Sequence, residues 1–516
     1  MYNFFKSLAI AIILVAACEN AFAQNCNALT PSGGDDAVFI NNCLATQGSA
    51  TLTANTFLIF QPITAIQMPN RSLIGAGKNL TKIIPQFSCG DPRFVNTSDN
   101  SYKIPLEIRR SDNSVVRDFT LELKNLTRTC GHKMITAVSV NRSPGTTLEN
   151  LKIIGSRYGT VGYTTGWGSG RGIHVQNSEN TTVRNTNVAD LGFSGSFAGN
   201  EAIRIESSGN SLIENNDIHR VSFGIEVVNS TPAAGFTGDS SGTIVRNNII
   251  QGASLIGCPD CSNGRAMKFF ACGTGTEPPL RNLTVTGNSA TEYGGQINGQ
   301  FAGFGGAGLW LECGVTYSRF ESNSFTNAPF AEVGFFVNSI PFPPSGVEGA
   351  SHHNTFMFNH FEGGNCSNCF DVWFGPKGPD QNGISKNNLG NNTVGRGTTR
   401  DDAGNQCSTF GSAWFQYPSG QNFINRGQNL LVAGTGIRPP SFFAVITFRF
   451  KNSSGVEVAT YQTQRSQSNC VVNQENVFIN PAVFAPGLYT VTAEYYDGTA
   501  PDLFIKGDPI GTLDVR

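Results

Sequence analysis

One short pattern recurs through the middle of the chain: an apolar residue, two variable residues, an asparagine, another variable residue and a second apolar residue. It occurs at Ile213–Ile218, Val245–Ile250, Val285–Ala290, Phe320–Phe325, Phe356–Phe361 and Ile384–Leu389. Successive asparagines are 32, 40, 35, 36 and 28 residues apart. A uniform helical repeat would hold its length more tightly. The pattern therefore predicts a solenoid with loops of different length on one face.

In such a solenoid, the asparagines of successive coils lie one above another. Each side-chain amide can donate to the next carbonyl up the stack, in a turn that no strand ladder covers. We therefore assign these asparagines a structural role and no catalysis. An earlier unit, Val183–Val188, has Thr186 in the asparagine position.

A second strand, with apolar residues at alternate positions, precedes each asparagine unit. Alternation directs one residue of each strand inward, namely Ile173, Ile203, Ile225, Met267, Leu309, Phe335 and Phe370. Segments 106–110 and 137–141 fit more loosely. We expect about nine or ten coils, which at ~4.8 Å per coil make a cylinder of roughly 45 Å.

The beginning of the chain carries a family resemblance. Gly34-Asp35-Asp36-Ala37 followed by Val38-Phe39-Ile40, and then the segment 72–77 (SLIGAG), resembles the opening of the pectate-lyase-like (pectin lyase fold) superfamily. The resemblance implies a right-handed parallel β-helix over about residues 30–425. It also implies that Asp35 and Asp36 cap the first coil and do not catalyse.

The pattern changes after about residue 425, where the asparagine units stop. Residues 442–450 and 488–495 alternate strictly, and Asp497-Gly498 forms a turn signal. About 90 residues of short strands predict a small Ig-like β-sandwich. We expect an all-β chain with a signal peptide at 1–23, a parallel β-helix at 24–425 and the sandwich at 426–516.

The first residues are typical of an export signal. Lys6 precedes an apolar run over 8–17, and Ala21-Phe22-Ala23 offers a cleavage site. We expect a secreted protein, extracellular or periplasmic. The alternative is a lipobox that would attach a lipid, and hence a membrane anchor, to Cys18. No later segment is long and apolar enough to span a bilayer.

The cysteines favour disulfides. Of 13, one is removed with the signal, and an even number in an exported chain predicts pairing. Cys26 and Cys43 could pin the mature N-terminus. Two C-x-x-C pairs, 258–261 and 366–369, could bind zinc, but loop disulfides are favoured. His352, His353 and His360 are interpreted as surface residues.

The overall charge excludes some partners. With 35 Lys and Arg against 37 Asp and Glu, the net charge is −2, so neither nucleic acid nor an anionic membrane is expected. We expect a monomer. The superfamily resemblance allows a calcium cofactor, although no tight aspartate cluster indicates one.

The outward residues of the alternating strands are the candidate site. In chain order they are His174, Arg204, Glu226, Lys268, Trp310, Phe336 and Asp371, with Ser139 and Glu107 below and with Glu206 and Glu312 two positions further along. Alternating charges on adjacent coils could simply pair as a structural ladder. Long loops over one sheet face and exposed aromatic residues favour a polysaccharide site instead.

The leading hypothesis is a lyase that cleaves a uronic-acid polysaccharide by β-elimination. That reaction needs a cation for the uronate carboxylate, and a base and an acid for the protons. Arg204 or Arg265 could hold the carboxylate. Lys268 could be the base if cations such as Arg265 depress its pKa, and His174 is a second acid or base.

Two alternatives remain. A glycoside hydrolase needs paired carboxylates, for which Glu226 with Glu206 or Glu312 are candidates. The Gly-His-Gly of polygalacturonase-type β-helix hydrolases is absent from the sequence. The third class is an adhesin or glycan-binding solenoid without turnover.

Overall fold

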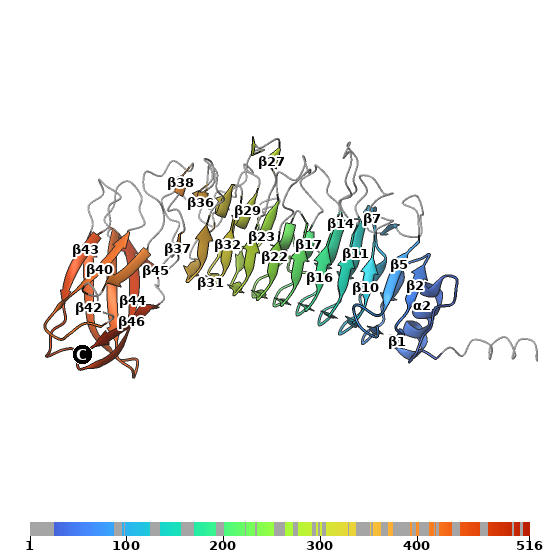
Figure 1. Cartoon of the computed structure of the whole chain (residues 1–516), viewed down its shortest axis with the longest axis horizontal. Coiled ribbons are helices and arrows are strands. Elements are labelled where there is room, and N and C mark those ends of the chain that lie inside the picture. The colour runs from blue at the N-terminus through green and yellow to red at the C-terminus, as the bar shows by residue number, and fades with distance from the viewer. Residues whose placement is uncertain are drawn as a thin grey trace, which may run out of the picture.

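The computed structural model shows an elongated solenoid of parallel strands with a separate β unit beyond its last coils (Figure 1). It describes residues 25–86, 95–96, 99–123, 135–155, 170–191, 201–221, 223–232, 235–251, 264–271, 277–291, 296–297, 300–301, 306–328, 330–336, 351, 354–362, 370–374, 393–394, 399–401, 412–416, 418, 423–435, 444–464, 473–497, 500–505 and 509–516.

Three long sheets run the length of the solenoid, and one coil contributes a strand to each. The first sheet contains β1 (Ser49–Thr51), β4 (Ser72–Ile74), β9 (Val115–Arg117), β12 (Thr147–Glu149), β15 (Thr182–Arg184), β18 (Leu212–Glu214), β21 (Ile244–Arg246), β25 (Thr284–Thr286), β31 (Arg319–Glu321) and β34 (Thr355–Met357). The second contains β2 (Thr56–Ile59), β5 (Lys82–Pro85), β10 (Thr120–Glu122), β13 (Lys152–Ile154), β16 (Asn187–Ala189), β19 (Asp217–His219), β22 (Ile249–Gln251), β26 (Ser289–Thr291), β32 (Ser324–Thr326), β35 (His360–Glu362) and β37 (Thr393–Val394).

The third sheet carries the candidate site. Its main path is β3 (Ile63–Ile66), β8 (Leu106–Arg109), β11 (Ile135–Asn141), β14 (Gly170–Gln176), β17 (Glu201–Glu206), β20 (Phe223–Val228), β23 (Arg265–Phe270), β29 (Ala307–Glu312), β33 (Ala331–Phe336), β36 (Phe370–Phe374) and β38 (Thr399–Asp401). Strands β6 (Val95–Asn96) and β7 (Asp99–Lys103) lie off this path. Two short pairs join β24 (Leu280–Arg281) to β30 (Val315–Thr316) and β27 (Gln296–Ile297) to β28 (Gln300–Phe301).

This topology is a parallel β-helix, wound in the right-handed sense that parallel connections adopt. The first sheet has ten strands and the second has eleven, which agrees with the expected nine or ten coils to within one or two. One apolar core fills the interior. Inward residues of the third sheet such as Ile203, Ile225 and Met267 are fully buried in it, as alternation predicted.

The stacked asparagines are confirmed. Asn216, Asn248, Asn288, Asn323 and Asn359 are buried, and each of the first four donates its Nδ2 to the Oδ1 of the next at 2.9 Å. The same Oδ1 atoms accept backbone N–H groups at 2.9–3.0 Å. The stack therefore satisfies turn amides that no sheet ladder reaches.

The predicted cap is also confirmed. Helix α2 (Asp36–Gln47) closes the first coil, and the Asp35 side chain caps it by accepting from the Ala37 N–H. The second carboxylate, that of Asp36, accepts the backbone N–H groups of Ser32 and Leu58. Both aspartates thus fasten the helix to the coil, and a disulfide between Cys26 and Cys43 pins the segment before it.

The C-terminal unit is a β-sandwich. One sheet contains β39 (Ser412–Gln416), β40 (Asn429–Thr435) and β43 (Asn473–Phe478); the other contains β42 (Glu457–Gln464), β41 (Ala444–Lys451), β44 (Gly487–Asp497), β45 (Ala500–Ile505) and β46 (Pro509–Val515). Both sheets contribute to one buried cluster, for example through Val432 and Phe448. Because β39 pairs with β40, the unit begins before the expected boundary at residue 425.

Some expectations lie outside the described residues. These are the signal segment with Cys18, the two C-x-x-C pairs, His352 and His353, and the asparagine unit at 384–389. The described part of the chain contains no helix that is long and apolar enough to cross a bilayer.

Candidate functional site

The predicted outward column exists on the third sheet. Its residues pair in register from coil to coil: His174 with Arg204, Arg204 with Glu226, Glu226 with Lys268, and Lys268 with Trp310. Ser139 and Glu107 continue the column below His174, as expected. Side chains 22 to 42 positions apart in the chain therefore become vertical neighbours.

The predicted register fails at the last two members. Gly334, and not Phe336, pairs with Trp310, while Phe336 pairs with Glu312. Trp373, and not Asp371, pairs with Gly334. The error is a slide along the strand, because alternation specifies which face a residue takes but leaves a shift of two residues undetermined. The side chains of Phe336 and Asp371 lie outside the described set.

A further outward column begins each of the central strands, and alternation alone did not reveal it. Two successive residues, Ala202 and Ile203, both belong to the core, so the alternation is interrupted there. Consequently Glu201, one residue earlier, reaches the outward charges, and Arg171 does the same in the coil below. Neither residue was predicted from the sequence. The available signal was the small and branched apolar pair that follows Glu201, namely Ala202 and Ile203.

The outward charges form one connected network, here called the charged ladder. It joins Arg171 to Glu201 (2.8 Å), Arg204 to Glu201 (3.3 Å), Glu206 (2.9 Å) and Glu226, Lys268 to Glu226 (3.3 Å) and Glu312 (3.1 Å), and His174 to Glu206 (3.0 Å). Every side chain in these pairs is at most 16% exposed. Such desolvated, mutually bonded charges hold fixed positions.

Burial and neighbouring charges act in opposite directions on the carboxylates of the ladder. Burial opposes ionisation of Glu201, but the adjacent Arg171 and Arg204 outweigh it and lower its pKa to about 2. Burial likewise opposes ionisation of Glu206, yet Arg204 and His174 hold its pKa well below the usual range. Both groups are therefore carboxylates at neutral pH.

His174 is occupied on both sides of its ring. Its Nε2 lies 3.0 Å from Glu206, and its Nδ1 lies 3.5 Å from the guanidinium of Arg171. Since a guanidinium only donates, Nδ1 accepts and Nε2 carries the proton. Burial lowers the pKa of this histidine, which favours that neutral form. Because both ring nitrogens already have protein partners, the geometry disfavours His174 as an acid or base.

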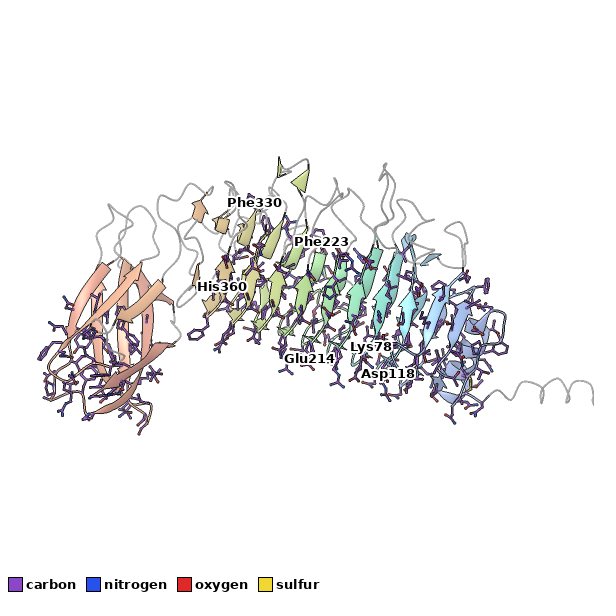
Figure 2. The ribbon with its side chains drawn as sticks, in the orientation of Figure 1. Lys78, Asp118, Glu214, Phe223, Phe330 and His360 are labelled. Carbon is purple, nitrogen blue, oxygen red and sulfur yellow. A yellow bond between two sulfur atoms is a disulfide. The ribbon has the colours of Figure 1, made fainter. Side chains whose placement is uncertain are left out.

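The other end of the site, the aromatic end, contains Phe223, Arg265, Phe270, Trp310 and Phe330. The Arg265 guanidinium lies 4.2 Å from the centre of the Trp310 ring and 5.8 Å from that of Phe223. Figure 2 places Phe223 and Phe330 along the upper side of the solenoid. A small apolar cluster of Trp310, Phe330 and two alanines lies here, separate from the main core.

The prediction that Trp310 is an exposed sugar platform is wrong. Its side chain is 1% exposed. The ring lies against the next coil at Gly334, where an added Cβ would be 2.4 Å from a ring carbon. Because the residue facing Trp310 has no side chain, the indole folds down onto the sheet and does not project from it.

The position of Lys268 decides which chemistry the site favours. Its ammonium lies between Glu226 and Glu312, whereas Arg265 lies over Trp310. Both carboxylates hold this ammonium in ion pairs, which would have to break before Lys268 could approach a sugar C–H group. Arg204 already contacts three carboxylates, which compete with a uronate for its donors.

The described residues contain no group of three or more His, Cys, Asp or Glu side chains arranged to hold a metal ion.

Comparisons with known proteins found distant similarity to several solved structures. No family model and no curated protein matches the chain. Among solved structures, a tailspike protein of E. coli bacteriophage HK620 is 12% identical, with 87% of this chain and 89% of that chain covered and a TM-score of 0.43. An exopolygalacturonase from Thermotoga maritima is 14% identical (76% and 89% covered, TM-score 0.43). The Streptococcus pneumoniae surface protein and adhesin PfbA is 11% identical (74% and 95% covered, TM-score 0.38).

Proposed function

We propose that this is a carbohydrate-active protein that holds a polysaccharide against the outward face of the third sheet and hydrolyses it with Glu226 and Glu312. The observation that carries the proposal is the pair of contacts from one ammonium: Lys268 Nζ lies 3.3 Å from Glu226 Oε1 and 3.1 Å from Glu312 Oε2. Two carboxylates are thereby held close together among desolvated groups, as glycoside hydrolysis requires.

The spacing favours a retaining reaction. The distance between Glu226 Oε1 and Glu312 Oε2 cannot exceed the sum of their two distances to Lys268 Nζ. That upper limit lies at the lower edge of the ~6.5–9.5 Å range of inverting enzymes and includes the ~5–5.5 Å of retaining ones. Glu226 is held in place by two cations, Arg204 and Lys268, so we assign it as the nucleophile. Glu312 is then the acid and base.

β-Elimination with Lys268 as the base is less favoured, because Glu226 and Glu312 already hold its ammonium in two ion pairs.

Binding without turnover is the second candidate. One observation favours it: in the part of the ladder around Arg204 and His174, each polar group already bonds another, as in a preorganised recognition surface. In that case the same face would bind a glycan and leave it intact.

The test is a polysaccharide panel with three readouts: reducing ends, the ultraviolet absorbance of unsaturated uronides, and binding. We expect new reducing ends without that absorbance, and a loss of at least ~10²-fold in kcat for Glu226→Gln and for Glu312→Gln. The matched control is Glu214→Gln. That glutamate is also buried and ion-paired, to Arg246 at 2.6 Å, but on the first sheet; it lies along the lower side in Figure 2.

Three outcomes would contradict the hydrolase. Unsaturated products abolished by Lys268→Ala would establish a lyase. Binding without products would establish the second candidate. Equal losses in Glu226→Gln and Glu214→Gln would show that the effect is structural.

We also propose that the protein is secreted and monomeric. The export-type N-terminal sequence supports secretion, and the Cys26–Cys43 disulfide fits an oxidising compartment. Cell fractionation and light scattering test these two points.

A further inference from the structure

The outward face of the third sheet is electrically balanced. In strands β14 to β29, its described cations are Arg171, Arg204, Arg265 and Lys268, and its described carboxylates are Glu201, Glu206, Glu226 and Glu312. His174 adds no charge at neutral pH, because burial lowers its pKa and Arg171 faces its Nδ1. Among the described groups of these strands, four positive charges therefore meet four negative ones, and β8 below adds one of each, Arg109 and Glu107, 3.4 Å apart.

The balance arises between neighbouring coils, whose opposite charges contact each other. Arg204 contacts three glutamates, and Lys268 contacts two. An anionic sugar placed against either cation would have to displace a carboxylate that is already bonded and desolvated. It would also lie beside the remaining carboxylates, at a cost that a single new ion pair does not offset.

A neutral sugar meets the opposite situation. Its hydroxyl groups donate to carboxylates and accept from ammonium or guanidinium groups, so fixed and alternating charges supply partners of both kinds. Next to the ladder, the half-buried ring of Phe270, with Lys268 Nζ 4.5 Å from its centre, adds apolar surface for the C–H face of a pyranose.

We infer that the glycan held by this face is neutral, without uronate or sulfate groups at the units that contact the charged ladder. The inference rests on the proposed function and narrows its substrate class. It differs from the uronic-acid polymer that the sequence predicted, because Arg204 already contacts three carboxylates and Arg265 lies over the Trp310 ring.

The experiment uses pairs of oligosaccharides with the same linkage that differ only at C6, a primary alcohol in one member and a carboxylate in the other. Calorimetry measures binding of each member to the full chain at low and at high salt, and product analysis follows turnover. We expect the neutral member of one pair to bind at least ~10-fold more tightly, with a Kd that changes less than about two-fold with salt.

A charge-shifted variant sharpens the test. Glu206→Gln removes one negative charge from the face and leaves Glu226 and Glu312 in place, and Glu149→Gln removes one from the first sheet, where Glu149 pairs with Arg184. We expect the first variant, and not the second, to gain salt-sensitive affinity for the acidic member.

The outcomes separate the two proposals. Neutral glycan bound but not cleaved supports this inference and overturns the hydrolase. Acidic glycan bound more tightly by the unmodified protein, with affinity that falls in salt, overturns the inference; its hydrolysis would leave the hydrolase intact. Failure of every pair to bind overturns both.

Discussion

Two columns of alternating charge run along the same solenoid, and they differ in what surrounds them. On the first sheet, Arg117, Glu149, Arg184, Glu214 and Arg246 follow one another in register. Their ion pairs are separate, 3.0 Å from Arg184 to Glu149 and 2.6 Å from Arg246 to Glu214, and both arginines are at least 40% exposed. On the third sheet the pairs are branched, and every member is at most 16% exposed.

The difference shows how one sequence pattern produces two kinds of surface. Exposed pairs in water contribute little, typically ~0–1 kcal/mol, and reorganise freely. Buried charges cost several kcal/mol each to desolvate, so they persist only when each is bonded to several partners. The first-sheet column is therefore a solvated ladder, and the third-sheet column is a rigid set of positioned groups that suits ligand binding.

The largest expected contrast is the loss of one arginine from each column. Arg204→Leu leaves three buried glutamates without their shared cation and should cost ~3–5 kcal/mol of unfolding free energy. Arg184→Leu should cost no more than ~1 kcal/mol. Urea unfolding measures both. Equal costs would erase the distinction between the two columns.

The second-largest expected effect is a loss of unfolding free energy in acid, caused by the charges of the third-sheet column. The folded-state pKa of Glu201 is below its ordinary value, so its stabilisation is complete above pH ~4.5 and is lost as the pH falls toward its folded pKa of about 2. The loss is on the order of 3 kcal/mol. His174, whose pKa is also lowered, contributes in the same direction below pH ~6.5.

Urea midpoints at neutral, mildly acidic and strongly acidic pH test this expectation. Glu201→Gln should flatten the profile between pH ~4.5 and ~2, and Glu149→Gln on the first sheet should leave it unchanged. A profile that keeps its slope in the first variant would show that the ladder is not the source of the acid sensitivity.

The smallest expected effect concerns the packing of the aromatic end. Gly334→Ala places a Cβ 2.4 Å from the Trp310 ring, so the indole must move, at ~1–3 kcal/mol. In Gly34→Ala the nearest atom is Ser32 Oγ at 3.8 Å, and the change should be close to neutral. Thermal unfolding and tryptophan fluorescence measure both. If Gly334→Ala changed neither the unfolding temperature nor the fluorescence, Trp310 would be loosely packed.

Most of the fold was predictable from local patterns. The asparagine spacing predicts the coils, and alternation places residues such as Ile225 and Met267 in the core, because a strand has only two faces. The column from His174 to Trp310 follows from stacking equivalent strands, and the two capping aspartates follow from their resemblance to a superfamily opening.

The chemistry of the site was not predictable in the same way. The sequence by itself determined which residues alternate and therefore which charges become vertical neighbours. Only the tertiary structure decided that Arg171 and Glu201 join them, that Gly334 lets Trp310 lie flat, and that Lys268 is shared by two carboxylates. The physical reason is that the face on which a side chain lies depends only on the two-residue period of its own strand. Register, burial and ion pairing depend on segments that meet only after the coils stack.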